Sequence, residues 1–177
     1  MTDNGNDLTI PVGDSDHLQG NPNAAIVLLE YGDFECPHCR RAYPIIQKIQ
    51  RHFKDDLCFV FRSFPLTQSH PHAEHAAEAA EAADQHGKFW EYHDRLYENQ
   101  HALDDASLSI YADELGIPVE QFDEAIAKGA FKDKVQQSFM SGVESGVNGT
   151  PSFFVNGSRY DGSWDYEDFS AYLNSLR

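Results

Sequence analysis

The sequence is poor in cysteine, in basic residues and in long apolar runs, and each shortage excludes a class of protein. Its three cysteines, Cys36, Cys39 and Cys58, cannot form a closed framework of structural disulfides. Against 29 aspartates and glutamates there are only 13 lysines and arginines, so the net charge is −16. A nucleic acid is therefore a poor partner, because phosphate binding needs clustered positive charge.

Membrane association is not expected either. No segment approaches the roughly 20 consecutive apolar residues that a membrane-spanning helix requires. The longest apolar run near the start covers residues 24–29, and the first twenty residues are polar and acidic, unlike a signal peptide. We therefore expect a cytoplasmic location, and we also expect a monomer.

The order of the predicted elements is that of an α/β protein. Apolar runs rich in β-branched and large side chains predict buried strands, and Asn156-Gly157 is a two-residue hairpin signal. Two helices complete a β-α-β half and a β-β-α half. The strands are expected over residues 24–31, 57–64, 152–155 and 158–160, and the helices over 36–53 and 165–176.

Between these halves almost every signal is helical, which predicts an all-helical insertion in an α/β fold. A chain of 177 residues is long enough for one core and short for two. We expect a single domain over residues 1–177, with a possible short strand at 8–12. Its parts are a loosely held N-terminal arm (1–20), an α/β core (21–66 and 148–177) and the helical insertion (67–147).

The segment that carries chemistry is Cys36-Pro37-His38-Cys39, at the start of the first predicted helix. A cysteine attacks disulfides as the thiolate, and an ordinary thiol with a pKa of about 8.5 is only slightly ionised at neutral pH. The N–H groups and dipole of a helix N-terminus stabilise negative charge on Cys36, and a nearby His38 stabilises it further. Pro37 suits the first helical turn. Cys39 lies one turn later on the same face.

This spacing predicts dithiol–disulfide exchange, with Cys36 as the nucleophile and Cys39 as the resolving thiol. No cofactor is expected, because the redox equivalents reside in the dithiol. Cys58 lies in an apolar strand and should be buried and inert.

Two other functions stay open. One is a zinc site, although no second Cys-x-x-Cys is present and ordinary surface histidines are the plainer account. The other is a binding or chaperone module that holds peptides without turnover, against which the presence of both cysteines speaks. The zinc site would use the cysteine pair with His38, or with the cluster His70, His72 and His75.

The run from Glu30 to Cys39, with residues 61–66, 70–74, 87–90 and 146–157, resembles the DsbA-like thiol–disulfide oxidoreductases of the thioredoxin superfamily. The resemblance covers about residues 17–175 and is closest to a leaderless branch. It implies a thioredoxin fold with a helical insertion, and an acidic, exposed Cys36. It also implies protein or peptide thiols and disulfides as partners, with glutathione or another redox protein as a further possibility.

The resemblance also assigns roles to three residues outside the tetrapeptide. Pro151 should follow a cis peptide bond and, with Thr150, orient the client. DsbA proteins carry valine before this proline and disulfide isomerases often carry threonine, so oxidase, isomerase and reductase directions all stay open. Glu30 should be a buried acid that relays a proton to or from Cys39. The alternative is a strand-end glutamate that is exposed or paired with Arg62.

Overall fold

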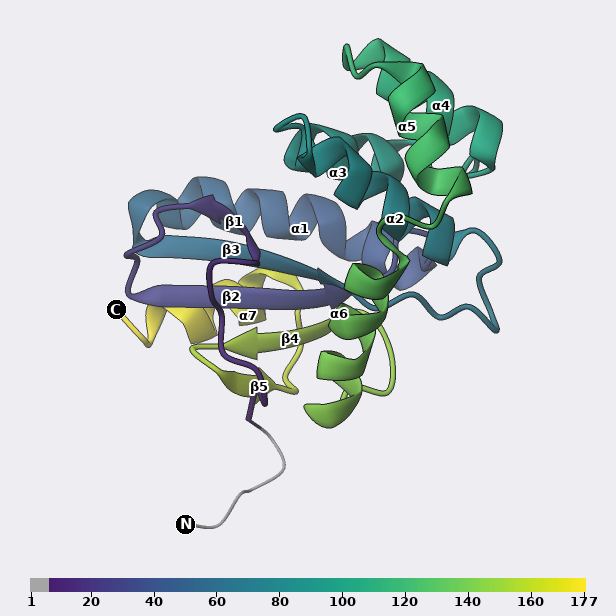
Figure 1. The fold of residues 1–177 in the computed structure, drawn as a ribbon. Coiled ribbons are helices and arrows are strands. Elements are labelled where there is room, and N and C mark those ends of the chain that lie inside the picture. Colours follow the sequence, from purple (N-terminus) through teal and green to yellow (C-terminus); the bar gives the residue numbers. More distant parts are fainter. Residues whose placement is uncertain (1–6) are drawn as a thin grey trace.

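The structure, a computed structural model, describes residues 7–177 and contains a five-stranded mixed sheet with strand order β1-β3-β2-β4-β5 (Figure 1). The central strand β2 is parallel to its neighbour β3, and every other neighbouring pair is antiparallel. The strands are β1 (His17–Gly20), β2 (Ile26–Gly32), β3 (Leu57–Ser63), β4 (Ser152–Val155) and β5 (Ser158–Tyr160).

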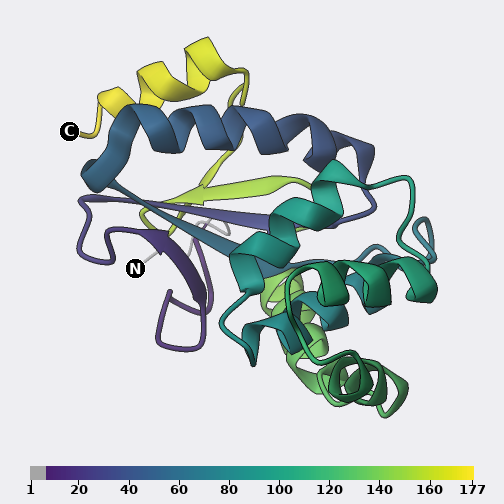
Figure 2. The ribbon, with the colours of Figure 1, turned by 90° about the horizontal axis from the view of Figure 1, so that it is seen from above.

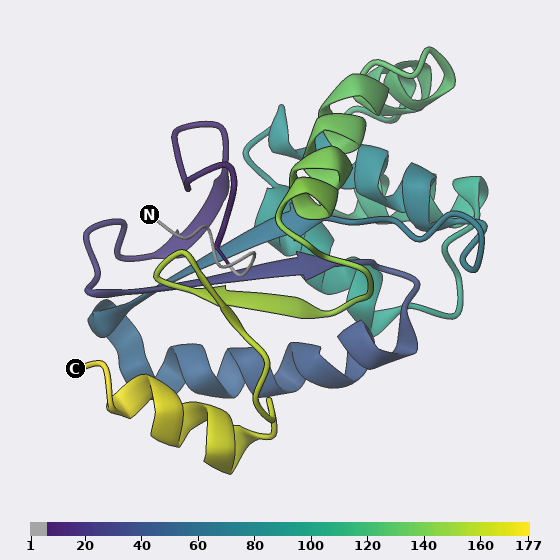
Figure 3. The same ribbon diagram turned by 90° about the horizontal axis from the view of Figure 1, so that it is seen from below.

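Helices cover both faces of this sheet. Helices α1 (Pro37–Phe53) and α7 (Tyr166–Asn174) lie side by side on one face (Figure 2), and α6 (Lys132–Glu144) lies on the other (Figure 3). Five helices occupy the chain between β3 and β4, which confirms the thioredoxin fold with an all-helical insertion. They are α2 (Ala73–Asp84), α3 (Phe89–Glu98), α4 (Asp105–Glu114), α5 (Val119–Ala127) and α6 (Lys132–Glu144).

Helix α1 begins where the sequence predicts it, because Pro37 occupies the first helical turn and needs no backbone N–H there. It continues through Pro44 to Phe53, and its apolar residues recur at helical spacing on the face that packs against the sheet. The buried set is Cys39, Ala42, Tyr43, Ile46, Ile49 and Phe53. Cys39 therefore belongs to the core-facing side of the helix.

The N-terminal arm differs from the expectation. Residues 8–12 form no strand, and the Leu8 N–H instead donates to the Gly157 carbonyl oxygen at 2.8 Å. The strand of this region is β1, which pairs with β3 at the sheet edge. Asp16, just before β1, forms an ion pair with Arg62 of β3 at 2.7 Å. Residues 7–20 are thus held against the core, and the rest of the predicted arm lies outside the described residues.

No helix within residues 7–177 has both the length and the apolar character needed to cross a bilayer. The apolar side chains instead form two buried clusters, one on each face of the sheet. The cluster under α1 and α3 includes Phe34 and both cysteines of the dithiol. The dithiol therefore lies at the edge of the larger core.

Candidate active site

The active-site turn is the connection between β2 and α1. Cys36 is the N-cap of α1, with φ −74° and ψ 123°, and its N–H donates to the Asp33 carbonyl oxygen at 3.1 Å. Gln100 of the insertion donates to the carbonyl oxygens of Phe34 and Cys36 at 2.9 and 2.8 Å. The turn is therefore fixed both by its own backbone and by a distant side chain.

Cys36 has an acidic thiol in a covered position. Its thiol donates to the Thr150 carbonyl oxygen at 3.6 Å, and the residue is only 3% exposed. The expectation of an exposed nucleophile is therefore wrong, because the loop before β4 lies against the sulfur. A hydrogen bond from the Cys39 thiol, with weaker ones from the Thr150 side chain and the Cys39 and His38 backbone, lowers the pKa of Cys36 to about 5 against the opposing effect of burial.

Cys39 has the opposite electrostatic character. The residue is fully buried, and burial together with its hydrogen bond to Cys36 and the charges of Glu30 and Cys36 raises its pKa well above 9.0. The Asp33 N–H, 3.5 Å from the Cys39 sulfur, opposes that rise. At neutral pH the pair therefore holds one thiolate and one thiol, as nucleophilic attack followed by resolution requires.

Glu30 is buried beneath the dithiol, and no cationic side chain of residues 7–177 pairs with it. Its Oε1 has no hydrogen-bond partner among the described residues, and burial, then the charge of Cys36, raises its pKa to about 8. Arg62 pairs with Asp16, so the alternative of a Glu30–Arg62 pair is wrong. Gly32 makes room for the Phe61 ring and for this carboxyl group, because a Cβ there would lie 2.5 Å from the ring and 2.9 Å from Glu30 Oε1.

Thr150 and Pro151 lie next to Cys36 although they are more than a hundred residues away in sequence. The peptide bond between them is cis. Within residues 7–177, the buried Thr150 hydroxyl has no partner other than the Cys36 sulfur. The loop therefore brings both a carbonyl oxygen and a hydroxyl to the nucleophile.

The histidines take different positions from one another. His38 is exposed, and it contributes to the lowered pKa of Cys36 through its backbone N–H. The predicted role of its imidazole therefore stays a prediction. His70 Nδ1 lies 2.8 Å from Asp33 Oδ2, and His75 Nδ1 lies 2.7 Å from Asp105 Oδ1. The His72 side chain is exposed.

Among the described residues, the three-residue cluster with metal-binding spacing is a different one, formed by His17, Glu81 and Asp84.

Asp33 and Gln100 are structural contributors that the sequence reasoning missed. The buried Asp33 carboxylate accepts hydrogen bonds from the Glu35 and Leu66 N–H groups at 2.8 and 2.9 Å, besides its contact with His70. An aspartate in a turn before a helix is a recognisable signal for such bonds. Gln100 follows α3 and has no comparable signal.

The acidity of Cys36 leads to a direct prediction. We expect the thiolate absorbance of the reduced chain to rise with pH around a midpoint of about 5, because the thiolate is stabilised by the groups described above. Thr150→Val keeps the shape of the side chain, removes the hydroxyl and should move the midpoint upward. Ultraviolet titration of both proteins checks this. A wild-type midpoint near that of an ordinary thiol contradicts it.

Comparison with known proteins identifies the family. The model of a family described as thioredoxin matches residues 13–175. Three solved structures have the same fold. Oxidised BdbD from Bacillus subtilis has a TM-score of 0.81 at 24% identity, covering 91% of this chain and 92% of its own. A thioredoxin-like oxidoreductase from Silicibacter pomeroyi DSS-3 has 0.81 at 27%, covering 93% and 94%. Wolbachia pipientis α-DsbA1 has 0.82 at 20%, covering 96% and 94%.

The curated relatives are larger proteins. Na(+)/H(+) antiporter NhaA 1 of Mycobacterium sp. (strain KMS) is 42% identical over 152 residues, which is 85% of this chain and 25% of the antiporter. NhaA 1 of Salinispora arenicola is 42% identical over 170 residues, 96% of this chain and 26% of the antiporter. The chain thus spans about a quarter of the length of these relatives. Because the family model matches nearly the whole chain around its Cys36–Cys39 pair, the chain belongs to the thioredoxin family and has the DsbA-like form of its fold.

Proposed function

We propose that this chain catalyses dithiol–disulfide exchange on protein or peptide substrates through its Cys-Pro-His-Cys motif. The observation that carries the proposal is the opposite shift of two neighbouring thiols, with the pKa of Cys36 lowered to about 5 and that of Cys39 raised. A solved structure of this fold from Wolbachia pipientis, α-DsbA2, is described as a thiol-disulfide exchange protein, which supports the same chemistry here.

In the reducing direction the reaction has two steps. The Cys36 thiolate attacks a client disulfide, so that a Cys36–client bond forms, the client disulfide breaks and one client thiolate leaves. Cys39 then gives its proton to Glu30 and attacks the Cys36 sulfur. The Cys36–Cys39 bond forms and the second client thiolate leaves. The client gains two electrons, which the dithiol loses, and the reverse sequence oxidises a client.

The electrostatics of the site favour this order. The negative charge of Cys36 contributes to the raised pKa of both Glu30 and Cys39. A mixed disulfide at Cys36 carries no charge, so both pKa values fall once it has formed. Burial remains the largest cause of the raised pKa at both residues. The fall therefore lets a larger fraction of Glu30 ionise and accept the proton of Cys39 in the state where Cys39 must react.

The remaining residues position the reactants. Thr150 and Pro151 lie beside the nucleophile, and in the proposal they orient the client strand. Pro37 starts the helix whose N-terminus stabilises the thiolate, and the exposed His38 ring adds positive charge when protonated. A cytoplasmic location and a monomeric state are part of the proposal as well.

Equilibration with glutathione buffers, together with an insulin-reduction assay, tests the proposal. We expect a two-electron transition between the free dithiol and a Cys36–Cys39 disulfide, and turnover of insulin disulfides. A zinc site predicts bound metal and no such transition, and a peptide-binding module predicts no turnover. The measured potential also gives the direction: about −270 mV, as in thioredoxin, favours a reductase, and about −120 mV, as in DsbA, favours an oxidase or isomerase.

A further inference from the structure

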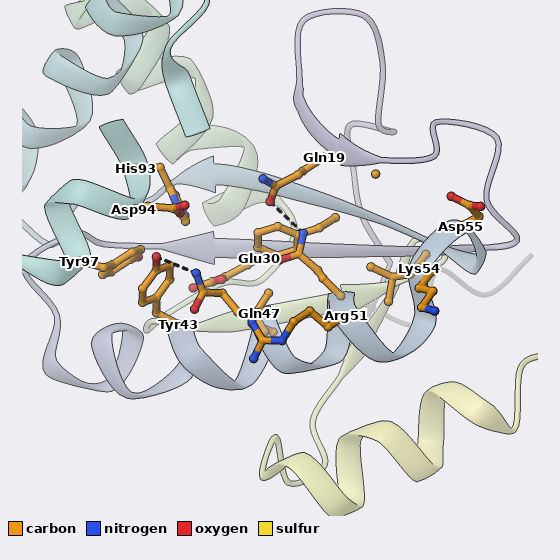
Figure 4. A pocket seen from close by; sticks show the side chains of 15 residues that line it. Gln19, Glu30, Tyr43, Gln47, Arg51, Lys54, Asp55, His93, Asp94 and Tyr97 are labelled. Atoms are coloured by element: carbon orange, nitrogen blue, oxygen red, sulfur yellow. Dashed lines mark hydrogen bonds and ion pairs between the residues drawn. The ribbon is translucent and has the colours of Figure 1, made fainter. Parts of the chain in front are cut away.

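A pocket of about 420 Å³ extends to Glu30 from the side of the molecule where α1 and α3 face each other (Figure 4). Glu30 of β2, Tyr43 and Gln47 of α1, and His93 and Tyr97 of α3 line it. Gln47 donates to the Tyr43 hydroxyl at 2.8 Å, and further out Gln50 donates to Gln19 at 2.8 Å. The pocket thus joins the acid beneath the dithiol to a polar surface.

Three residues that line this pocket each carry a buried polar atom with no hydrogen-bond partner among residues 7–177. The atoms are Glu30 Oε1, His93 Nε2 and Tyr97 Oη. Leaving such an atom unpaired costs about 1–3 kcal/mol, so buried polar groups are almost always satisfied by protein or by water. Three of them on residues around one pocket are the partners that ordered water requires.

His93 connects the inner part of this pocket to the outside. Its Nδ1 lies 2.9 Å from Asp94 Oδ1, a carboxylate that is partly exposed, and its Nε2 is the unpaired atom. Burial lowers the pKa of His93 despite Asp94, so the ring is neutral at neutral pH. A neutral imidazole that donates from Nδ1 accepts at Nε2, and can take a proton there while releasing one to Asp94.

Tyr97 lies deeper, between His93 and the dithiol. Its ring centre is 5.1 Å from that of His93 and 5.2 Å from that of Phe34, in the active-site turn. Burial, with the charges of Cys39 and Glu30, raises its pKa well above 10.0, so it remains a phenol that donates a hydrogen bond. Such a group orients water between Glu30 and His93.

We propose that His93 and Tyr97 of α3, with water in this pocket, carry the proton between Glu30 and solvent. The inference rests on the proposed function. The proton that Cys39 gives to Glu30 passes to pocket water held by Tyr97 and then to His93 Nε2, while the His93 Nδ1 proton leaves through Asp94. Titratable and charged groups surround the path: Cys36, Cys39, Glu30, Asp33, His17, Tyr43, Arg51, Lys54, Asp55, Asp94, Tyr97 and Glu98.

A stopped-flow reaction with a chromogenic aromatic disulfide separates the steps, because the first released thiolate reports attack by Cys36 and the second reports resolution by Cys39. We expect Tyr97→Phe and His93→Phe to leave the first phase within about twofold and to slow the second by about tenfold, part of the 10²–10⁴-fold typical of acid–base catalysis. The second phase should also show a larger solvent deuterium effect than in the wild type.

Tyr92→Phe is the matched control. Tyr92 is equally buried in α3, but its hydroxyl donates to the Leu108 carbonyl oxygen at 2.8 Å and it does not line the pocket. Its second phase should match the wild type. Tyr97→Phe breaks no hydrogen bond between described residues, so folding is retained and circular dichroism verifies it.

Two outcomes overturn the inference. If Glu30→Gln slows the second phase but Tyr97→Phe and His93→Phe leave it unchanged, the pocket takes no part and the proposed function stands. If the wild type itself releases no second thiolate, the proposed function fails, and the inference fails with it.

Discussion

Replacing Cys36 with serine is expected to lower the rate of disulfide exchange by about 10⁴-fold or more, the range lost when an enzyme loses its nucleophile. Serine has nearly the same size, but its hydroxyl is not ionised at neutral pH, whereas the pKa of Cys36 is about 5. Helix α1 does not depend on the thiol, because Pro37 and the backbone bond to Asp33 define its start. Insulin reduction and circular dichroism of the variant measure activity and folding.

Cys58→Ser is the control for that substitution. Cys58 lies in β3 opposite Gly20 and Val27, in the cluster on the other face of the sheet, and burial raises its pKa. It should lose some stability but retain the wild-type rate. Equal losses of activity in both variants would show that the effect comes from folding, and wild-type activity in Cys36→Ser would end the proposed mechanism.

Replacing Glu30 with glutamine is expected to raise the free energy of unfolding by about 3 kcal/mol at pH 7, at about 1.4 kcal/mol for each pH unit above 4.5, the ordinary pKa of a glutamate. The folded-state pKa of Glu30 is about 8, above the unfolded value. Between these two values the unfolded chain releases the proton and the folded chain keeps it, so stability falls as pH rises. Glutamine does not titrate and avoids this loss.

Urea unfolding between pH 4 and pH 8 measures the effect. The difference between Glu30→Gln and the wild type should be near zero at about pH 4 and should grow toward pH 8. Glu81→Gln is the matched control with the opposite sign, because His17 and Lys134 lower the pKa of buried Glu81 despite its burial. A difference for Glu30→Gln that does not vary with pH would contradict the raised pKa.

The same variant tests the catalytic role of Glu30. A gain in stability with a slower resolution step would show that the buried acid is kept for function at the expense of stability, as is common at active sites. We also expect a smaller gain when Glu30→Gln is made in the Cys36→Ser background, because the charge of Cys36 contributes to the shift. An unchanged resolution rate would remove Glu30 from the mechanism.

The local elements were predictable because their signals are local. Pro37 after Cys36 marks the start of α1, and Asn156-Gly157 marks the hairpin between β4 and β5. The hydrophobic patterns likewise predicted β2, β3 and the helices of the insertion. The N-terminal strand was predicted at residues 8–12, whereas the structure places it at β1 (His17–Gly20). A half-buried edge strand has a weak apolar pattern, and its pairing partner, β3, is distant in sequence.

The position of the dithiol on the chain, and the chemistry it predicts, followed from the order of residues around Cys36 and Cys39, since backbone geometry at a helix start depends on near neighbours. How strongly those thiols are shifted did not follow from it. Three features of the site depend on residues that are distant in sequence. Thr150 covers Cys36, and Arg62 pairs with Asp16 instead of Glu30. One pocket is lined by Glu30, His93 and Tyr97. The pKa values depend on burial, on hydrogen bonds and on nearby charges, and those that distant residues supply arise only when the chain folds.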